Sequence, residues 1–161
     1  MSEMNEIPTE MPWLAPLRIM DAAIEEGDRA LAVRAWREAY GAALDDAGWR
    51  GLVEVAAACT RIGRLPNFGT AARARARETY WTAQFRARQQ RSVTGVLKAA
   101  EGFGALGDTA MVAQCIRIAQ SLAPQYPYGG GAGERSDVEG VELGLPYVNG
   151  HVSERLPQPR S

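Results

Sequence analysis

The chain has 161 residues, of which 46% are apolar, and its net charge is −1 at neutral pH. This length fits one domain of ordinary size with room for a tail. A near-neutral chain exerts no strong overall attraction on nucleic acid or on an anionic membrane. No segment approaches the roughly 20 consecutive apolar residues of a membrane span, and the acidic start differs from a secretory signal. These properties favour a cytoplasmic protein without membrane insertion.

Six segments show the apolar spacing of amphipathic helices, and no segment shows the alternation of a strand. The first opens at Trp13, with Pro16 in its first turn, and ends at Gly27. Asp28 is a typical N-cap for the second, which the polar stretch before Gly48 ends. The fold class is therefore predicted to be all-α. The predicted helices cover residues 13–26, 29–44, 49–62, 68–90, 93–106 and 109–122.

These helices form an internal repeat. Gly27-Asp28 and Gly107-Asp108 mark the same turn in two copies of a helical hairpin, and Gly63-Arg64 marks a weaker copy between them. The marks are 36 and then 44 residues apart, so the second interval contains an expansion, expected in the fourth helix. A hairpin cannot bury its apolar face alone. Three antiparallel hairpins are therefore expected to stack.

The hairpins resemble tetratricopeptide repeats over about residues 13–126. That family spaces bulky and small residues along two helices, closes with a proline and has a period of about 34 residues. The resemblance implies protein or peptide binding in a groove lined by the first helix of each hairpin, without catalysis. A compact six-helix bundle of another topology is the alternative. The matching residues are Val96, Ala99, Ala100, Phe103, Val112, Ile116 and Pro124 in the last copy, Pro16, Ile19, Met20, Ala23, Ala32 and Trp36 in the first, and Leu52, Val55, Ala56 and Cys59 in the middle.

The two ends of the chain differ in composition from the helices. Residues 1–12 are predicted to form a flexible acidic arm, and residues 13–126 the helical repeat domain. Residues 127–161 are rich in Gly and Pro and are predicted to be disordered alone, ordering against a partner or against the hairpins. Apolar residues of this tail are suited to fill pockets, and Tyr147 is a candidate partner contact.

The fourth predicted helix is apolar on two opposite sides. A helical projection places five small or aromatic residues, centred on Ala76, on one side, and Trp81 and Phe85 on the other. Two interpretations remain open here. In one, both sides are buried by neighbouring helices. In the other, Trp81 and Phe85 stay exposed and bind a partner together with the flanking Arg77 and Arg88, because aromatics and Arg are enriched at interface hot spots.

Nucleic-acid binding and self-association are two alternative uses of this helix. Six Arg and one Glu between residues 73 and 91 suggest phosphate contacts, so a nucleic-acid-binding or regulatory protein is the alternative function. Exposed Trp81 and Phe85 would also allow a homo-oligomer. Trp36 and Tyr40 of the second helix are instead expected in the core.

No catalytic, cofactor or metal site is predicted. His151 is the only histidine and lies in the tail, and Cys59 and Cys115 have the pattern of small buried hydrophobes. The Gly-rich stretch 129–133 lacks the Lys-Ser/Thr of a phosphate loop. We therefore expect a non-catalytic interaction module that acts as an adaptor, accessory subunit or assembly factor of a larger complex.

Overall fold

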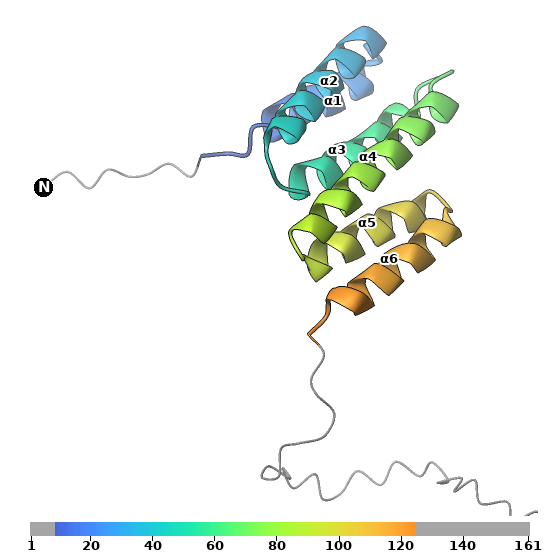
Figure 1. Cartoon of the computed structure of the whole chain (residues 1–161). Helices are drawn as coiled ribbons and strands as arrows, with labels where there is room; N and C mark the ends of the chain where they lie inside the picture. Colours follow the sequence, from blue (N-terminus) through green and yellow to red (C-terminus); the bar gives the residue numbers. More distant parts are fainter. Residues whose placement is uncertain (1–8, 125–161) are drawn as a thin grey trace, which may run out of the picture. The chain divides into compact units, whose positions relative to one another are not determined.

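The computed structural model of the chain describes residues 9–124, which form six α-helices and, within that range, no strand (Figure 1). The predicted all-α class is confirmed, and every helix ends within a few residues of its predicted bounds. No helix among these residues is long and apolar enough to cross a membrane. The helices are α1 Leu14–Glu26, α2 Arg29–Asp45, α3 Arg50–Ile62, α4 Gly69–Gln89, α5 Val93–Ala105 and α6 Thr109–Leu122.

Short polar residues begin three of the helices. The Asp28 side chain accepts a hydrogen bond from the backbone N–H of Leu31 at 3.0 Å, and Asp108 accepts one from Met111 at 3.1 Å. Ser92 caps α5 in the same way, a cap that the sequence analysis missed. Because each side chain satisfies one of the free donors of a helix start, these residues fix where the helices begin.

The turn inside the middle hairpin differs from the other two. Gly27 and Gly107 both have φ of 74°, the left-handed conformation that lets a hairpin turn within two or three residues. Gly63 instead has φ of −60°, and the chain continues through residues 63–68 before α4 begins. The expansion predicted in the fourth helix is therefore shared between this longer turn and α4, which has 21 residues against 17 in α2.

The helices pack as consecutive antiparallel pairs, α1 with α2, α3 with α4 and α5 with α6, and each pair packs on the next (Figure 1). The first helices also contact one another, because α3 touches both α1 and α5. This sequential order confirms the predicted stack of three hairpins. We call the contact between the first two hairpins the first junction, and the contact between the last two the second junction.

Both junctions bring a tryptophan against a glycine. Trp13 precedes α1 and lies on Gly51 of α3, where a Cβ would be 2.8 Å from its ring carbons. Trp49 precedes α3 and lies on Gly95 of α5, where a Cβ would be 2.7 Å from the ring. Only a residue without a side chain permits such an approach. The two tryptophans are 36 residues apart and the two glycines 44 residues apart, so these contacts repeat the two intervals found in the sequence.

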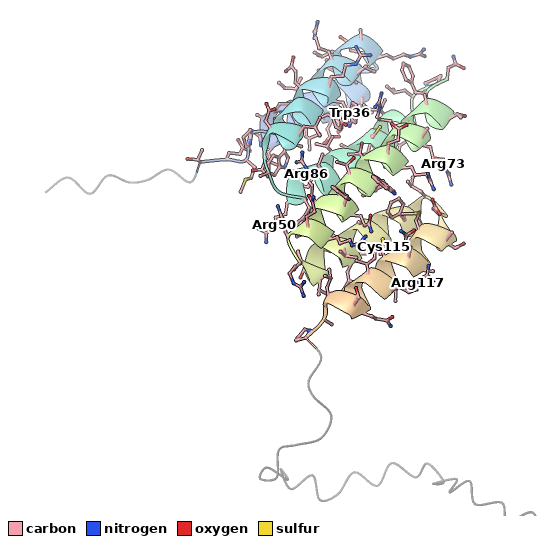
Figure 2. The ribbon with its side chains drawn as sticks, viewed as in Figure 1. Trp36, Arg50, Arg73, Arg86, Cys115 and Arg117 are labelled. Carbon is pink, nitrogen blue, oxygen red and sulfur yellow. The ribbon has the colours of Figure 1, made fainter. Side chains whose placement is uncertain are left out.

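A second bulky residue enters each junction from the second helix. Trp36 of α2 is buried and donates its indole N–H to the backbone oxygen of Val55 at 2.9 Å (Figure 2). Tyr80 of α4 occupies the equivalent place and lies against Gly102 of α5, where a Cβ would be 2.2 Å from its ring. The expectation that Trp36 belongs to the core is confirmed, and Tyr40 is half-buried beside it.

Both cysteines are buried and free, as expected of small core residues. Burial raises the pKa of the Cys59 thiol to about 11 and also raises the pKa of Cys115. A high pKa disfavours the thiolate, which is the reactive form. Neither thiol is therefore suited to nucleophilic chemistry.

Candidate protein-interaction surface

Helix α4 buries one of its two apolar sides and exposes the other. The side centred on Ala76 packs against α3 and α5, and its members Ala72, Ala76, Tyr80, Ala83 and Ala87 are all buried. Trp81 and Phe85 on the opposite side are 51% and 46% exposed. Of the two interpretations of this helix, the one that leaves the aromatic pair exposed therefore matches the structure.

The two exposed aromatic rings lie side by side. The ring centroids of Trp81 and Phe85 are 6.1 Å apart and the rings are nearly parallel, at 4°. Residues four apart on a helix are neighbours on its surface, so the spacing alone brings them together. The pair forms a short apolar ridge, and large exposed aromatics of this kind are more informative than scattered single hydrophobes.

The arginines of α4 divide by function, and Arg86 is structural. Its guanidinium donates to four backbone oxygens at the end of α2, with the shortest bond, 2.6 Å, to Asp46 and another of 3.0 Å to Leu44. Gln90 donates to Ala47 beside it at 2.8 Å. A helix end carries unpaired carbonyls and partial negative charge, which a cation satisfies. Arg86 thus ties α4 back to the first hairpin.

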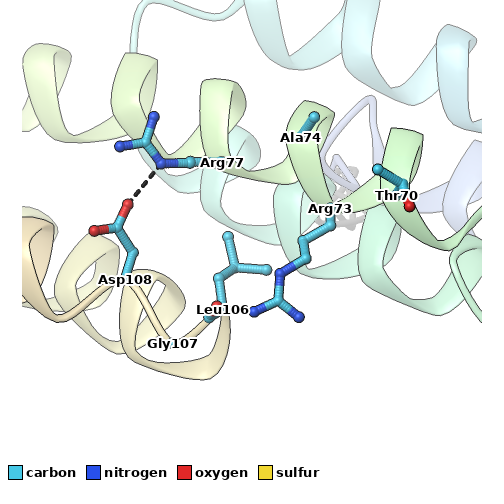
Figure 3. A pocket seen from close by; sticks show the side chains of 7 residues that line it. All are labelled: Thr70, Arg73, Ala74, Arg77, Leu106, Gly107 and Asp108. Atoms are coloured by element: carbon cyan, nitrogen blue, oxygen red, sulfur yellow. Dashed lines mark hydrogen bonds and ion pairs between the residues drawn. The ribbon is translucent and has the colours of Figure 1, made fainter.

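Two arginines near the other end of α4 tie it forward to the third hairpin. Arg73 donates to the backbone oxygen of Leu106 at the end of α5, and Arg77 pairs with Asp108 at 2.6 Å (Figure 3). The hydrogen bond from Arg77, helped by the N–H of Met111, lowers the pKa of the Asp108 carboxyl. These residues border a hollow of about 460 Å³, in which the charge of Arg77 is paired with Asp108 and Arg73 is bonded to Leu106.

The predicted partner-binding residues are therefore only partly free. Arg88 is exposed beside Phe85 and forms no ion pair with a residue between 9 and 124. Arg77 is also exposed, but its charge is shared with Asp108. Tyr147 and the predicted tail, residues 127–161, lie outside the described part of the chain, so their assignments stay predictions.

Two further arginines occupy the repeat position of Trp81 on the other second helices. Trp81 of α4 occupies the repeat position held by Arg37 in α2 and by Arg117 in α6, and all three side chains are exposed. The three residues therefore share one repeat position on the second helices of the hairpins, although α2 and α4 do not touch each other. We call these three residues, together with Phe85 and Arg88, the outward ridge. It joins an apolar centre to positively charged flanks.

A basic hollow on α2 extends this charge. Arg29, Arg34 and Arg37 line a hollow of about 460 Å³ whose apolar wall includes Phe68 from the long α3–α4 turn. Sequence reasoning missed these residues, because the turn that brings Phe68 to α2 belongs to the expansion of the middle hairpin. The spacing of the three arginines along one helix was the available signal.

The groove of the first helices is a separate surface. Arg61 of α3 pairs with Asp21 of α1 at 2.8 Å, and Glu54 accepts a hydrogen bond from the indole of Trp13 at 2.7 Å. Trp81 and Phe85 project from the side of α4 that faces away from α3 and α5. The side of the first helices and the aromatic pair are therefore two separate surfaces.

No group of three metal-binding side chains occurs within residues 9–124. No protein family, curated protein or solved structure matches the chain. What the surface does must therefore be argued from its own chemistry.

Proposed function

We propose that this chain is a tetratricopeptide-like interaction module that works as an adaptor, accessory subunit or assembly factor, and that it binds its partner protein through the outward ridge. The observation that carries the proposal is the exposed pair of Trp81 and Phe85 on a helix whose other apolar residues are buried. Half-exposed aromatics contribute little to the fold, whereas Trp and Arg anchors dominate protein interfaces.

The charges around the pair define the partner's chemistry. Arg88 lies beside Phe85, and Arg37 and Arg117 occupy the repeat position of Trp81 on the other second helices, so the ridge suits a protein segment that places carboxylates on both sides of an apolar anchor. Such charges steer association and select the partner more than they add affinity. Binding is therefore expected to weaken as salt rises, while the apolar centre retains part of it.

An acidic protein is favoured over nucleic acid for two reasons. Three of the six arginines that suggested phosphate binding, Arg73, Arg77 and Arg86, contact the chain's own helix ends and Asp108. Helix α1 and the segment before it are also acidic, since residues 9–28 carry five acids and one Arg. Both features reduce the continuous basic path that a nucleic-acid backbone requires.

The test is capture of partners from the source cells with the full chain and with the Trp81→Ala/Phe85→Ala double variant. We expect a stoichiometric protein on the wild type that binds the double variant at least about thirtyfold more weakly, since two hot-spot truncations cost about 2 kcal/mol or more. Met11→Ala is the matched control, because Met11 is 49% exposed on another part of the surface. Equal capture of the partner by the wild type and by the Trp81→Ala/Phe85→Ala variant would contradict the proposal. Captured material that is lost on nuclease treatment would also contradict it.

A further inference from the structure

The two junctions of the stack bury the same stripe of a first helix. We call the side of a first helix that faces the preceding hairpin the receiving stripe. Its four positions are buried in α3 and again in α5, and small residues at them admit the tryptophan and tyrosine rings of the preceding hairpin. The receiving stripe consists of Gly51, Val55, Ala58 and Ile62 in α3, and of Gly95, Ala99 and Gly102 in α5 with Leu106 directly after it.

The same stripe is exposed on α1, which has no hairpin before it among residues 9–124. The 36-residue interval places Ala15, Ile19, Ala22 and Glu26 at these four positions, and all four are exposed. Ile19 is 48% exposed, whereas its equivalents Val55 and Ala99 are fully buried. The first hairpin therefore exposes its receiving stripe, which no residue between 9 and 124 covers.

The last hairpin presents the opposite half of a junction. Trp36 and Tyr80, which enter the following hairpin, are 7% and 4% exposed, but the equivalent residue of α6, Ile116, is 44% exposed. Leu97 of α5 is 42% exposed, although its equivalent Leu17 is buried. Both side chains are uncovered because no further hairpin follows α6 in the described part of the chain.

These apolar ends are unusual for a helical stack. Terminal repeats generally carry polar outer faces, which keep such proteins soluble. Here Ile19, Leu97 and Ile116 account for three of the six large exposed hydrophobic residues within 9–124. Moreover, one end carries the inserting half of the junction and the other end carries the receiving half.

We propose that a second copy of this chain is the partner for these ends, with the α1 side of one copy stacking on the α5/α6 side of the next. A second copy is favoured over a foreign helix because the receiving stripe and the position that enters the next hairpin are both exposed on the same chain. Val93 stands in the place of Trp49 and Ala15 in the place of Gly51, so this contact would use smaller side chains than the two internal junctions. The two surfaces differ, so each added copy presents the same free end and the assembly stays open. This contact does not involve Trp81 or Phe85 and is independent of the proposed function.

The test measures the mass of the full chain by light scattering from micromolar to millimolar concentration. We expect the wild type to grow in mass with concentration, and both Ile19→Asp and Ile116→Asp to stay monomeric. An equimolar mixture of the two variants retains one intact receiving end and one intact inserting end. The mixture is therefore expected to form a one-to-one dimer that grows no further, an outcome that only a head-to-tail contact produces.

Several results would overturn the proposal. A constant monomer mass of the wild type over the whole range would do so. Growth that survives Ile19→Asp but disappears in the Trp81→Ala/Phe85→Ala variant would instead assign self-association to the outward ridge. Loss of a captured foreign protein in Ile116→Asp, with a monomeric wild type, would show that another protein occupies the end. Ala22→Arg and Gln120→Arg form a second pair of exposed changes, one at each end, to be used if either Asp variant fails to fold by circular dichroism.

Discussion

The two junctions share one pattern of steric contacts but differ in their hydrogen bonds. In the first, the indole of Trp13 lies on Gly51 and donates to Glu54, and the indole of Trp36 donates to Val55. In the second, Trp49 lies on Gly95, but a lysine stands in the place of Glu54, and Tyr80 provides the inserted ring. Shape is therefore repeated along the stack, whereas hydrogen bonding is specific to each junction.

Helix α4 accounts for most of this difference. Its Arg86 reaches back to the end of α2 (Figure 2). Its Arg73 and Arg77 reach forward to the α5–α6 turn (Figure 3). The helix is longer than α2 or α6, so its two ends contact both neighbouring hairpins. Three of the α4 arginines that suggested an anionic partner therefore form hydrogen bonds and ion pairs between the chain's own hairpins.

Among the glycine substitutions, the largest effect is expected at the tightest contact of the second junction. Gly102→Ala places a Cβ 2.2 Å from the ring of Tyr80, and we expect a loss of about 2–3 kcal/mol in the free energy of unfolding from overpacking. Gly104→Ala in the same helix is the control, because its Cβ is 3.7 Å from Val112. Better helix propensity should stabilise it by about 0.5–1 kcal/mol. Urea unfolding of both variants distinguishes these results, and equal stabilisation would contradict the packing.

The shared pattern of steric contacts predicts similar losses at the two tryptophan contacts. Gly51→Ala and Gly95→Ala each place a Cβ within 2.8 Å of an indole, so each should lower the free energy of unfolding by about 1–2 kcal/mol. Thermal unfolding monitored by tryptophan fluorescence compares them. A harmless change at one glycine and a costly one at the other would show that the junctions are not equivalent.

The first junction should depend on Arg86. Arg86→Met leaves several carbonyls at the end of α2 without this donor, and we expect a loss of about 1–2 kcal/mol after allowance for their contact with water. Arg88→Met on the same helix should change the free energy of unfolding by less than about 0.5 kcal/mol. Hydrogen exchange at the end of α2 should accelerate only in the Arg86 variant. Unchanged exchange there would argue against this tie.

The second junction should respond to acid through Asp108. Its pKa is lowered in the folded state, mainly by Arg77, so the carboxylate stabilises the fold above the ordinary Asp pKa. That stabilisation disappears as the pH falls through the folded pKa. In Arg77→Met the folded-state pKa should rise towards its ordinary value, so the loss of stability on acidification should become smaller. An NMR titration of the Asp108 carboxyl follows this shift, and identical midpoints in both proteins would refute it.

Much of the fold could be predicted because local signals coincide. Asp28 and Asp108 cap helices, and Gly27 and Gly107 close turns, so helix bounds followed from residue type and spacing. The expansion was placed wholly in α4 because helical periodicity does not separate an extra turn of helix from a longer connection. The turn's positive φ at Asn67 leaves no strong mark in the sequence.

The candidate site was less predictable for physical reasons. A helical projection shows that Trp81 and Phe85 share a side of the helix, but not whether a neighbour covers it. The bonds of Arg86 join residues about 40 positions apart, and only the packing of the hairpins brings them together. That Arg37, Trp81 and Arg117 share one repeat position likewise follows only when the second helices of the three hairpins are aligned.

Trp81 and Phe85 can serve as a partner-binding pair only if the fold does not need them for its stability. The decisive measurement compares the free energy of unfolding of the Trp81→Ala/Phe85→Ala double variant with that of Trp36→Ala, whose indole is buried in the first junction. We expect a loss below about 1 kcal/mol for the exposed pair and about 3–5 kcal/mol for Trp36. A loss for the double variant as large as that for Trp36 would show that the pair belongs to the core, and would contradict its assignment to partner binding.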